Sequence, residues 1–219
     1  MSDCTITYLS SNKETPEFER KTRETLLQNC GDLPIIAVTQ KPVDLGPNST
    51  NIVIGDVGAS GYNFCRQLQI AVEVAKTRFV ISAESDCIYP PDYFTWRPPK
   101  DDIVYRNTNQ YVLKYKQGFF KKNTSTFAQI SGRDFLLERL NYLFVLKPES
   151  PAWSTEMRNF PKEYGVRFLE SYAEFRTENP CVSFKTGRGM RLHTVTEHEE
   201  FTEIPYWGKA EDLRKHYEG

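Results

Sequence analysis

The sequence predicts one α/β domain with a central, mostly parallel sheet flanked by helices, and a smaller mixed region after it. Short β-branched and apolar runs alternate with amphipathic helical segments in the N-terminal part. The chain of 219 residues is long enough for one such domain with a full core and short for two. Hydrophobic residues make up 39% and charged residues 26%, which is typical of a globular protein.

The elements expected over residues 1–92 follow the order strand, helix, strand, strand, helix, strand. Thr15 is a suitable N-cap, Pro16 fits the first helical position, and Gly31 should end that helix. The last strand is almost wholly apolar, which indicates a central strand covered on both faces. The expected strands are 5–10, 34–39, 51–54 and 78–83, and the expected helices are 16–30 and 62–76.

The pattern changes after Pro91, where a hairpin is expected instead of another strand-helix unit. Its strands are 110–115 and 119–122, joined by a turn at 116–118. Ser131 and Asp134 have the spacing of a capping box at the start of a helix that runs through 144. Further strands are expected at 101–105 and 182–185, with a short helix from Ser154 and a last helix at 210–217.

Composition excludes several classes of protein. The 28 basic and 29 acidic residues nearly cancel, and the pI is about 6.3, so a polyanion partner is not indicated. No apolar run approaches the ~20 residues that cross a bilayer, and the N-terminus lacks the plan of a signal peptide, so a cytoplasmic protein without a membrane partner is expected. Five scattered cysteines without a C-x-x-C pair indicate reduced thiols.

Two carboxylates follow the apolar strand directly. Glu84 and Asp86 are one residue apart, and Pro90 and Pro91 come soon after them. Strand alternation would place both acids on one side, at the sheet edge where α/β proteins bind ligands. Two facing carboxylates repel each other unless a cation lies between them, so the sequence predicts a divalent metal site. The alternative is a pair of solvated residues that ends a strand.

This order of elements, with an acidic-x-acidic motif and a proline, resembles nucleotide-sugar-dependent glycosyltransferases of the GT-A fold, a Rossmann-like fold. Their signature is D-x-D, whereas this chain has Glu84-Ser85-Asp86 and departs at the first position. The resemblance covers residues 4–92 well and the remainder loosely. It implies that Asp86 holds Mn²⁺ or Mg²⁺ against the donor's diphosphate, where the cation would neutralise the charge that develops on the leaving group. Glu84 would be a second ligand, a water-mediated contact or a contact to the ribose.

The resemblance also implies roles for residues elsewhere in the chain. Residues 1–92 would bind the nucleotide sugar, and residues 93–219 would form the acceptor side and the tail. His193 would be a third metal ligand, and Glu156 a general base at a helix start. Each has an ordinary alternative, a structural histidine and a glutamate stabilised by the helix dipole. By the same resemblance Ser10, Ser11 and Arg66 would contact the nucleotide, although the serines also fit a plain strand-to-loop transition. Lys185 and Arg188 lie beside glycines and can pair with diphosphate oxygens, and their alternative is simple solvation.

The sequence therefore predicts a metal-dependent glycosyltransferase that moves a sugar from an NDP-sugar, with UDP favoured, to an unidentified hydroxyl acceptor. One alternative is the same chemistry on hydroxymethylated bases of DNA, as in viral DNA modification, because the hairpin at 105–122 places lysines among aromatics. Another is a non-catalytic nucleotide- or sugar-binding module. Sugar nucleotidyltransferases share the sheet, but the residues at 10–14 are not their glycine-rich loop. Neither G-x-G-x-x-G nor a P-loop motif is present.

Overall fold

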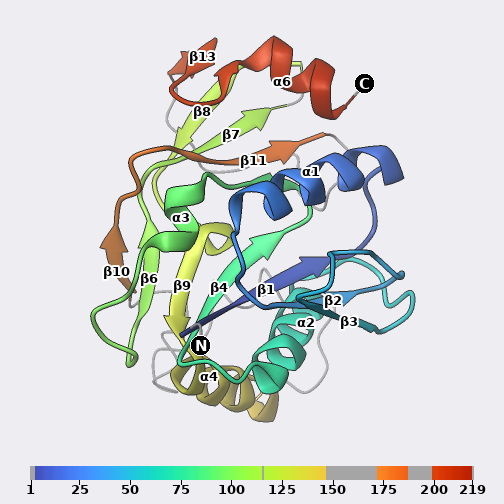
Figure 1. Ribbon diagram of the computed structural model, residues 1–219, viewed down its shortest axis with the longest axis vertical. Coiled ribbons are helices and arrows are strands. Elements are labelled where there is room, and N and C mark those ends of the chain that lie inside the picture. Colours follow the sequence, from blue (N-terminus) through green and yellow to red (C-terminus); the bar gives the residue numbers. More distant parts are fainter. Residues whose placement is uncertain (1–2, 115, 147–171, 187–198, 219) are drawn as a thin grey trace.

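The computed structural model describes residues 3–114, 116–146, 172–186 and 199–218. These residues form a seven-stranded sheet, a five-stranded sheet and a short two-stranded ribbon (Figure 1). Two helices cover one face of the large sheet, and the small sheet lies beyond the opposite face. The predicted α/β class with a smaller mixed region is confirmed.

The large sheet has the order β10-β6-β9-β4-β1-β2-β3. The four strands β3, β2, β1 and β4 are parallel, and β9 is antiparallel to both β4 and β6. Strands β2 and β3 extend the sheet to one side of β1 and β4 extends it to the other, so the strand order reverses beside β1. Such a reversal marks the ligand crevice of open α/β sheets. The bounds are β1 Cys4–Ser10, β2 Ile35–Thr39, β3 Ser49–Val53, β4 Phe79–Glu84, β6 Val104–Asn107, β9 Gln129–Gly132 and β10 Tyr172–Phe175.

The helices begin where the sequence predicts them. The Thr15 side chain accepts a hydrogen bond from the Phe18 amide at 3.2 Å and caps α1 (Pro16–Asn29). Ser60 caps α2 (Gly61–Val74) in the same way. Gly31 follows α1 with a φ of +60°, a conformation that favours glycine. These local signals mark the start of both helices and the end of α1, and the two side-chain caps satisfy backbone amides that a helix leaves unpaired.

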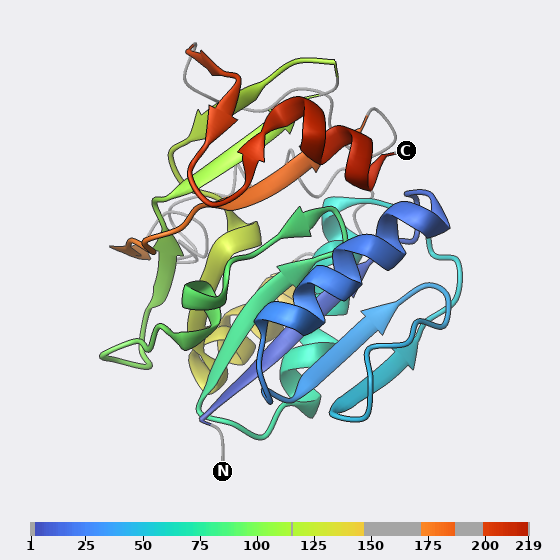
Figure 2. The ribbon, with the colours of Figure 1, turned by 45° about the horizontal axis from the view of Figure 1, so that its top comes forward.

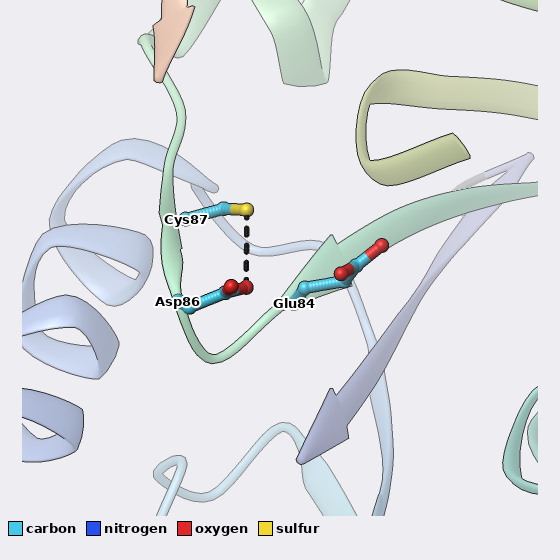
Figure 3. A group of neighbouring side chains, drawn as sticks. All are labelled: Glu84, Asp86 and Cys87. Atoms are coloured by element: carbon cyan, nitrogen blue, oxygen red, sulfur yellow. Dashed lines mark hydrogen bonds between the residues drawn. The ribbon is translucent and has the colours of Figure 1, made fainter. Parts of the chain in front are cut away.

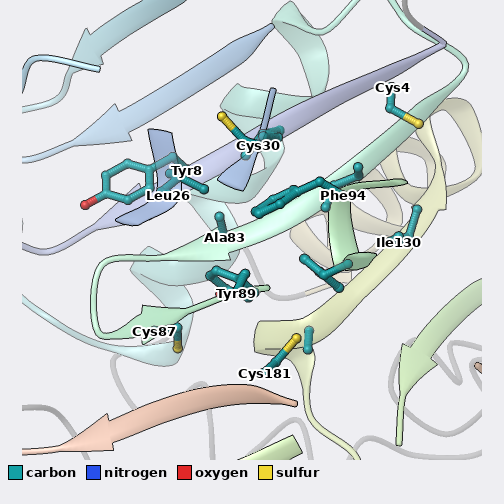
Figure 4. Close-up of a cluster of buried hydrophobic side chains, with 14 of the residues drawn as sticks. Cys4, Tyr8, Leu26, Cys30, Ala83, Cys87, Tyr89, Phe94, Ile130 and Cys181 are labelled. Atoms are coloured by element: carbon teal, nitrogen blue, oxygen red, sulfur yellow. The ribbon is translucent and has the colours of Figure 1, made fainter. Parts of the chain in front are cut away.

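Alternation along β1 divides the core between the two faces of the sheet. Ile6 and Tyr8 pack towards α1, in a cluster that also holds Tyr89 from beyond β4 (Figure 4). Leu9 points to the other face, where it packs with residues of α2 such as Leu68. Helix α4 (Arg133–Leu146) completes that second layer. Successive side chains of β1 therefore point to opposite faces of the sheet and pack into two separate hydrophobic layers.

The small sheet has the order β12-β8-β7-β11-β5. One of its faces packs against α1 and the last helix, α6 (Ala210–Tyr217), and Phe18 of α1 contacts Phe184 at 5.2 Å between ring centroids (Figure 2). Helix α1 is thus shared by both sheets. The bounds are β5 Cys87–Ile88, β7 Gln110–Lys114, β8 Phe119–Lys122, β11 Cys181–Lys185 and β12 Glu200–Phe201, and the ribbon pairs β13 Glu203–Ile204 with β14 Gly208–Lys209.

Some local predictions are wrong. Ser131 does not cap α4, because it lies in β9 and its hydroxyl donates to the Gly132 carbonyl. The strand expected from 101 begins at Val104. The sequence did not indicate β5, β9, β10 or the short helix α3 (Pro91–Thr95). None of the helices in the described ranges has the length and apolarity needed to cross a membrane.

Candidate metal and donor site

The acidic motif lies at the junction of the two sheets. Glu84 ends β4 in the large sheet, residues 85–86 form a turn, and β5 then joins the small sheet. Strand alternation is therefore the wrong reason for placing Glu84 and Asp86 together, because Asp86 lies in the turn. The turn itself brings the two acids close, and Figure 3 shows Asp86 and Cys87 projecting from the returning chain towards the end of β4.

Three side chains of this turn form a possible metal site. Glu84, Asp86 and Cys87 each offer one ligand atom, and these atoms lie within 4.8 Å of one another. The Cys87 thiol also donates to Oδ1 of Asp86 at 3.4 Å. Ligand atoms that share a divalent cation each lie ~2.0–2.6 Å from it, so spacings of this size fit one ion. The donor set suits a divalent cation bound mainly by carboxylate oxygen.

Hydrogen bonds to the backbone of the turn hold it to three different elements. The Ser85 amide donates to the Leu9 carbonyl of β1 at 3.1 Å, and the Thr22 hydroxyl of α1 donates to the Ser85 carbonyl at 2.9 Å. The Phe184 amide of β11 donates to the Asp86 carbonyl at 2.8 Å. A metal site binds best when its ligands are already in position before the ion arrives. These three hydrogen bonds hold the backbone of the turn, and so the ligand side chains, in position.

Tyr89 supports the turn from inside the core. Its hydroxyl accepts from the Glu84 amide at 2.9 Å and donates to the Phe127 carbonyl at 3.0 Å. The ring is 1% exposed and stacks on Tyr93 at 5.0 Å between centroids. One buried hydroxyl thus satisfies two backbone groups, one in β4 and one just before β9.

We expect Tyr89→Phe to destabilise the protein by about 1–2 kcal/mol, because it leaves the Glu84 amide and the Phe127 carbonyl without this partner. Chemical denaturation of the purified chain measures the loss. Tyr142→Phe is the matched control, because Tyr142 is 40% exposed on α4. Equal midpoints for the Tyr89 variant and the wild type would show that the hydroxyl does not hold the turn.

The electrostatics of the turn favour a bound cation. Burial and the neighbouring Asp86 raise the pKa of Glu84 to about 7, although Lys185 and Lys122 act in the opposite direction. Nζ of Lys185 lies 3.7 Å from Oδ2 of Asp86. Burial alone would lower the pKa of Lys185, but Asp86 and its neighbours raise it above its usual value. A cation bound between the two acids would relieve their repulsion and favour the ionised form of Glu84.

The residues predicted to contact the nucleotide sugar lie in different surroundings. Lys185 ends β11 beside Asp86. Ser10 ends β1, with a buried hydroxyl that donates to Glu19 at 3.1 Å and accepts from the Asn12 amide at 2.9 Å. Ser11 follows it and is half-buried. The Ser10 contacts are those of a structural strand end, and a nucleotide role for either serine stays a prediction.

Arg66 lies on the α2–α4 side of the large sheet. Its guanidinium is 3.7 Å from the centre of the Phe144 ring and donates to Gln69 at 3.0 Å. These contacts join α2 to α4, and none of them involves Glu84 or Asp86. A nucleotide contact for Arg66 stays a prediction.

Three predicted site residues, Glu156, Arg188 and His193, lie outside the described residues. Sequence reasoning missed two others that the fold brings to the turn. Cys87 adds a thiol, and Lys122 at the end of β8 is close enough to influence the pKa of Glu84. Cys87 could have been found from its position next to Asp86. Lys122 is 36 positions from Asp86, and only the pairing of strands in the small sheet brings it near the turn.

Comparisons with known proteins support the fold. No protein-family model and no curated protein sequence matches this chain. The apo-form glycosyltransferase GlyE of Streptococcus pneumoniae TIGR4 is similar at a TM-score of 0.50 and 10% identity, over 78% of this chain and 44% of that chain. This chain thus spans less than half the length of GlyE.

A second similar structure is a putative glucose-1-phosphate thymidylyltransferase from Bacillus anthracis in complex with a sucrose. Its TM-score is 0.51 at 10% identity, over 82% of this chain and 89% of that chain. At such low identity the likeness shows the fold alone. The chain has a GT-A-like fold, shared with glycosyltransferases and sugar nucleotidyltransferases, as the sequence predicts.

Proposed function

From this fold and its acidic turn we propose a metal-dependent glycosyltransferase that moves a sugar from a nucleoside-diphosphate sugar to an acceptor hydroxyl. The observation that carries the proposal is the group of Glu84, Asp86 and Cys87 at the carboxyl end of β4. This strand lies next to β1 at the reversal of strand order, where open α/β sheets bind ligands. We propose Mn²⁺ or Mg²⁺ as the cation and a UDP-linked donor.

The residues of the turn would act on the donor's diphosphate. Asp86 and Glu84 would hold the cation, which supplies positive charge where the leaving diphosphate becomes more negative. The ammonium of Lys185, 3.7 Å from Asp86, can pair with a diphosphate oxygen from the same side. The hydrogen bonds that Thr22 and Phe184 donate to the turn, and the one that the turn donates to Leu9, keep this charge in place, so little reorganisation is needed during the reaction.

The remaining assignments complete the proposal. Residues 1–92 would bind the donor and residues 93–219 would form the acceptor side. Ser10, Ser11 and Arg66 would contact the nucleotide, and Arg188 the diphosphate. His193 would complete the metal ligands. Glu156 would take the proton from the acceptor hydroxyl if the reaction inverts the sugar.

A sugar nucleotidyltransferase is the second candidate, because the thymidylyltransferase from Bacillus anthracis has a similar TM-score and is matched over most of its length. A glycosyltransferase and a sugar nucleotidyltransferase would use different substrates, so a test of substrates distinguishes the two candidates. A glycosyltransferase binds an NDP-sugar, whereas a thymidylyltransferase would use a nucleoside triphosphate and a sugar 1-phosphate. A non-catalytic module would bind a donor without turning it over.

A thermal-shift panel tests the proposal, because a ligand that binds only the folded state raises its melting temperature. We expect UDP-sugars with Mn²⁺ to give the largest shift among UDP-, GDP-, ADP- and CMP-linked donors. We also expect slow hydrolysis of the best donor. Turnover of a triphosphate with a sugar 1-phosphate would favour the nucleotidyltransferase, and binding without hydrolysis or transfer would favour the module.

A further inference from the structure

Three loops leave the large sheet on the edge where the acidic turn lies (Figure 1). Strands β1, β2 and β3 are parallel neighbours that end at Ser10, Thr39 and Val53. Leu9 of β1 pairs with Glu84 at the end of β4. Neighbouring strands lie ~4.7–4.9 Å apart, so the loop after β1 is next to the turn and the loop after β2 starts ~10 Å from the end of β4.

The side chain of Asn12 joins the first two of these loops. Asn12 follows β1 with a φ of +50°, a left-handed conformation that asparagine tolerates better than most residues. Its Oδ1 accepts hydrogen bonds from the Gln40 amide at 3.0 Å and the Lys41 amide at 2.9 Å, just after β2. Nε2 of Gln40 donates in turn to the Gly58 carbonyl at 2.6 Å, in the loop after β3. One side chain thus begins a series of hydrogen bonds across all three loops.

Glu19 of α1 holds Asn12 from inside the protein. Its Oε2 accepts from Nδ2 of Asn12 at 2.8 Å, and its Oε1 accepts from the Ser10 hydroxyl at 3.1 Å. The Glu19 side chain is only 4% exposed, and Nη1 of Arg23 lies 3.6 Å from Oε2. Ser11 lies between Ser10 and Asn12, so the same contacts also fix the backbone on both sides of a serine that the sequence predicts as a nucleotide contact.

The proposed function indicates which part of the donor would lie over these loops. A nucleotide sugar carries its nucleoside and its sugar on opposite ends of the diphosphate. With the diphosphate at the acidic turn, the sugar must reach the acceptor side, and the nucleoside then extends over the ends of β1 and β2. The reversal of strand order beside β1, where open α/β sheets bind ligands, lies in the same place.

We propose that Asn12 is a positioning residue for the nucleoside of the donor, because it holds the loops after β1 and β2 in the arrangement that receives this group. Glu19 acts through Asn12. The inference rests on the proposed function and adds two residues to it. Loops that are ordered before the ligand arrives lose less conformational freedom on binding, so the network should increase affinity. Its effect should fall on the nucleoside, because other hydrogen bonds hold the acidic turn.

Calorimetry with two probes, UDP and pyrophosphate, each in the presence of Mn²⁺, tests the inference. Asn12→Asp keeps the oxygen that accepts from the Gln40 and Lys41 amides, but it removes the Nδ2 donor and places a second carboxylate against Glu19. We expect this variant to bind UDP at least about tenfold more weakly than the wild type. Its affinity for pyrophosphate should stay within about twofold, because pyrophosphate has no nucleoside.

A second substitution should rescue the first. In Asn12→Asp combined with Glu19→Gln, the new amide can donate to the new carboxylate, so the hydrogen bond is restored with its direction reversed and the net charge of the pair is unchanged. We expect the double variant to bind UDP within about threefold of the wild type. Asn48→Asp is the matched control, because Asn48 is exposed and precedes β3 at the opposite end of the sheet. It should change neither titration.

Three results would overturn the inference. They are an Asn12 variant that binds UDP as tightly as the wild type, an equal loss of UDP and pyrophosphate binding, and a double variant that recovers no affinity for UDP. An equal loss would show general damage to the fold, and no recovery would show that Glu19 does not act through Asn12. A wild-type chain that binds neither probe with Mn²⁺ would instead overturn the proposed function, and this inference with it.

Discussion

Asp86→Asn should abolish metal-dependent binding of the donor and reduce turnover about 10²–10³-fold, the loss seen when one preorganised electrostatic contact to a transition state is removed. Asparagine keeps the size of the side chain but removes the charge that would bind the cation and that pairs with Lys185 at 3.7 Å. Thermal shift with UDP-sugar and Mn²⁺ measures binding, and hydrolysis of the UDP-sugar measures turnover.

Asp102→Asn is the control for this variant. Asp102 is exposed, and it precedes β6 at the opposite end of the large sheet from Glu84. Its variant should bind and hydrolyse the donor as the wild type does. A fully active Asp86 variant would show that the cation, if one binds, is held elsewhere.

Glu84→Gln should stabilise the metal-free protein above pH 7 and weaken its binding of Mn²⁺ at least tenfold. The pKa of Glu84 is about 7 in the folded chain and 4.5 in a model peptide. Between pH 4.5 and pH 7, therefore, Glu84 keeps its proton in the folded state but has lost it in the unfolded state. Stability falls as pH rises through about 4.5–7, because unfolding releases a proton in that window. Glutamine removes this loss, which is on the order of 1–3 kcal/mol at pH 8.

Denaturation curves at pH 4 and pH 8 measure the effect, with Glu138→Gln as control because Glu138 is exposed on α4. The Glu84 variant should match the wild type at pH 4 and exceed it at pH 8. In the wild type, Mn²⁺ affinity should rise as pH increases to about 7, since only the ionised carboxylate binds the cation. A wild type whose stability and Mn²⁺ affinity do not change with pH would contradict this electrostatic account.

Much of the fold follows from local signals in the sequence. The apolar run of β4, the alternation in β1 and the caps at Thr15 and Gly31 each depend on residues within one element. They predicted the parallel strands and both N-terminal helices almost to the residue. Elements that depend on distant partners were missed. Strand β5 has two residues, and β9 is an antiparallel insertion between β4 and β6.

In the candidate site, too, residues with a local signal could be predicted and residues that depend on distant partners could not. Glu84 and Asp86 stand out in the sequence because they follow a buried strand, although a turn and not strand alternation brings them together. Lys122 could not be found in this way, because its position depends on the pairing of β8 with β7 and of β7 with β11. The second of these pairings joins residues 71 positions apart, such as Gln110 and Cys181. The position of Lys122 near the acidic turn is therefore a property of the fold that no local pattern predicts.

Calorimetric titration of UDP into the wild-type chain, with and without Mn²⁺, is the most direct measurement of the central claim. The account predicts that UDP binds at least tenfold more tightly with Mn²⁺ than without it, and that Asp86→Asn removes this difference. UDP binding that is the same with and without the ion, or a metal dependence that survives in the Asp86 variant, would contradict it.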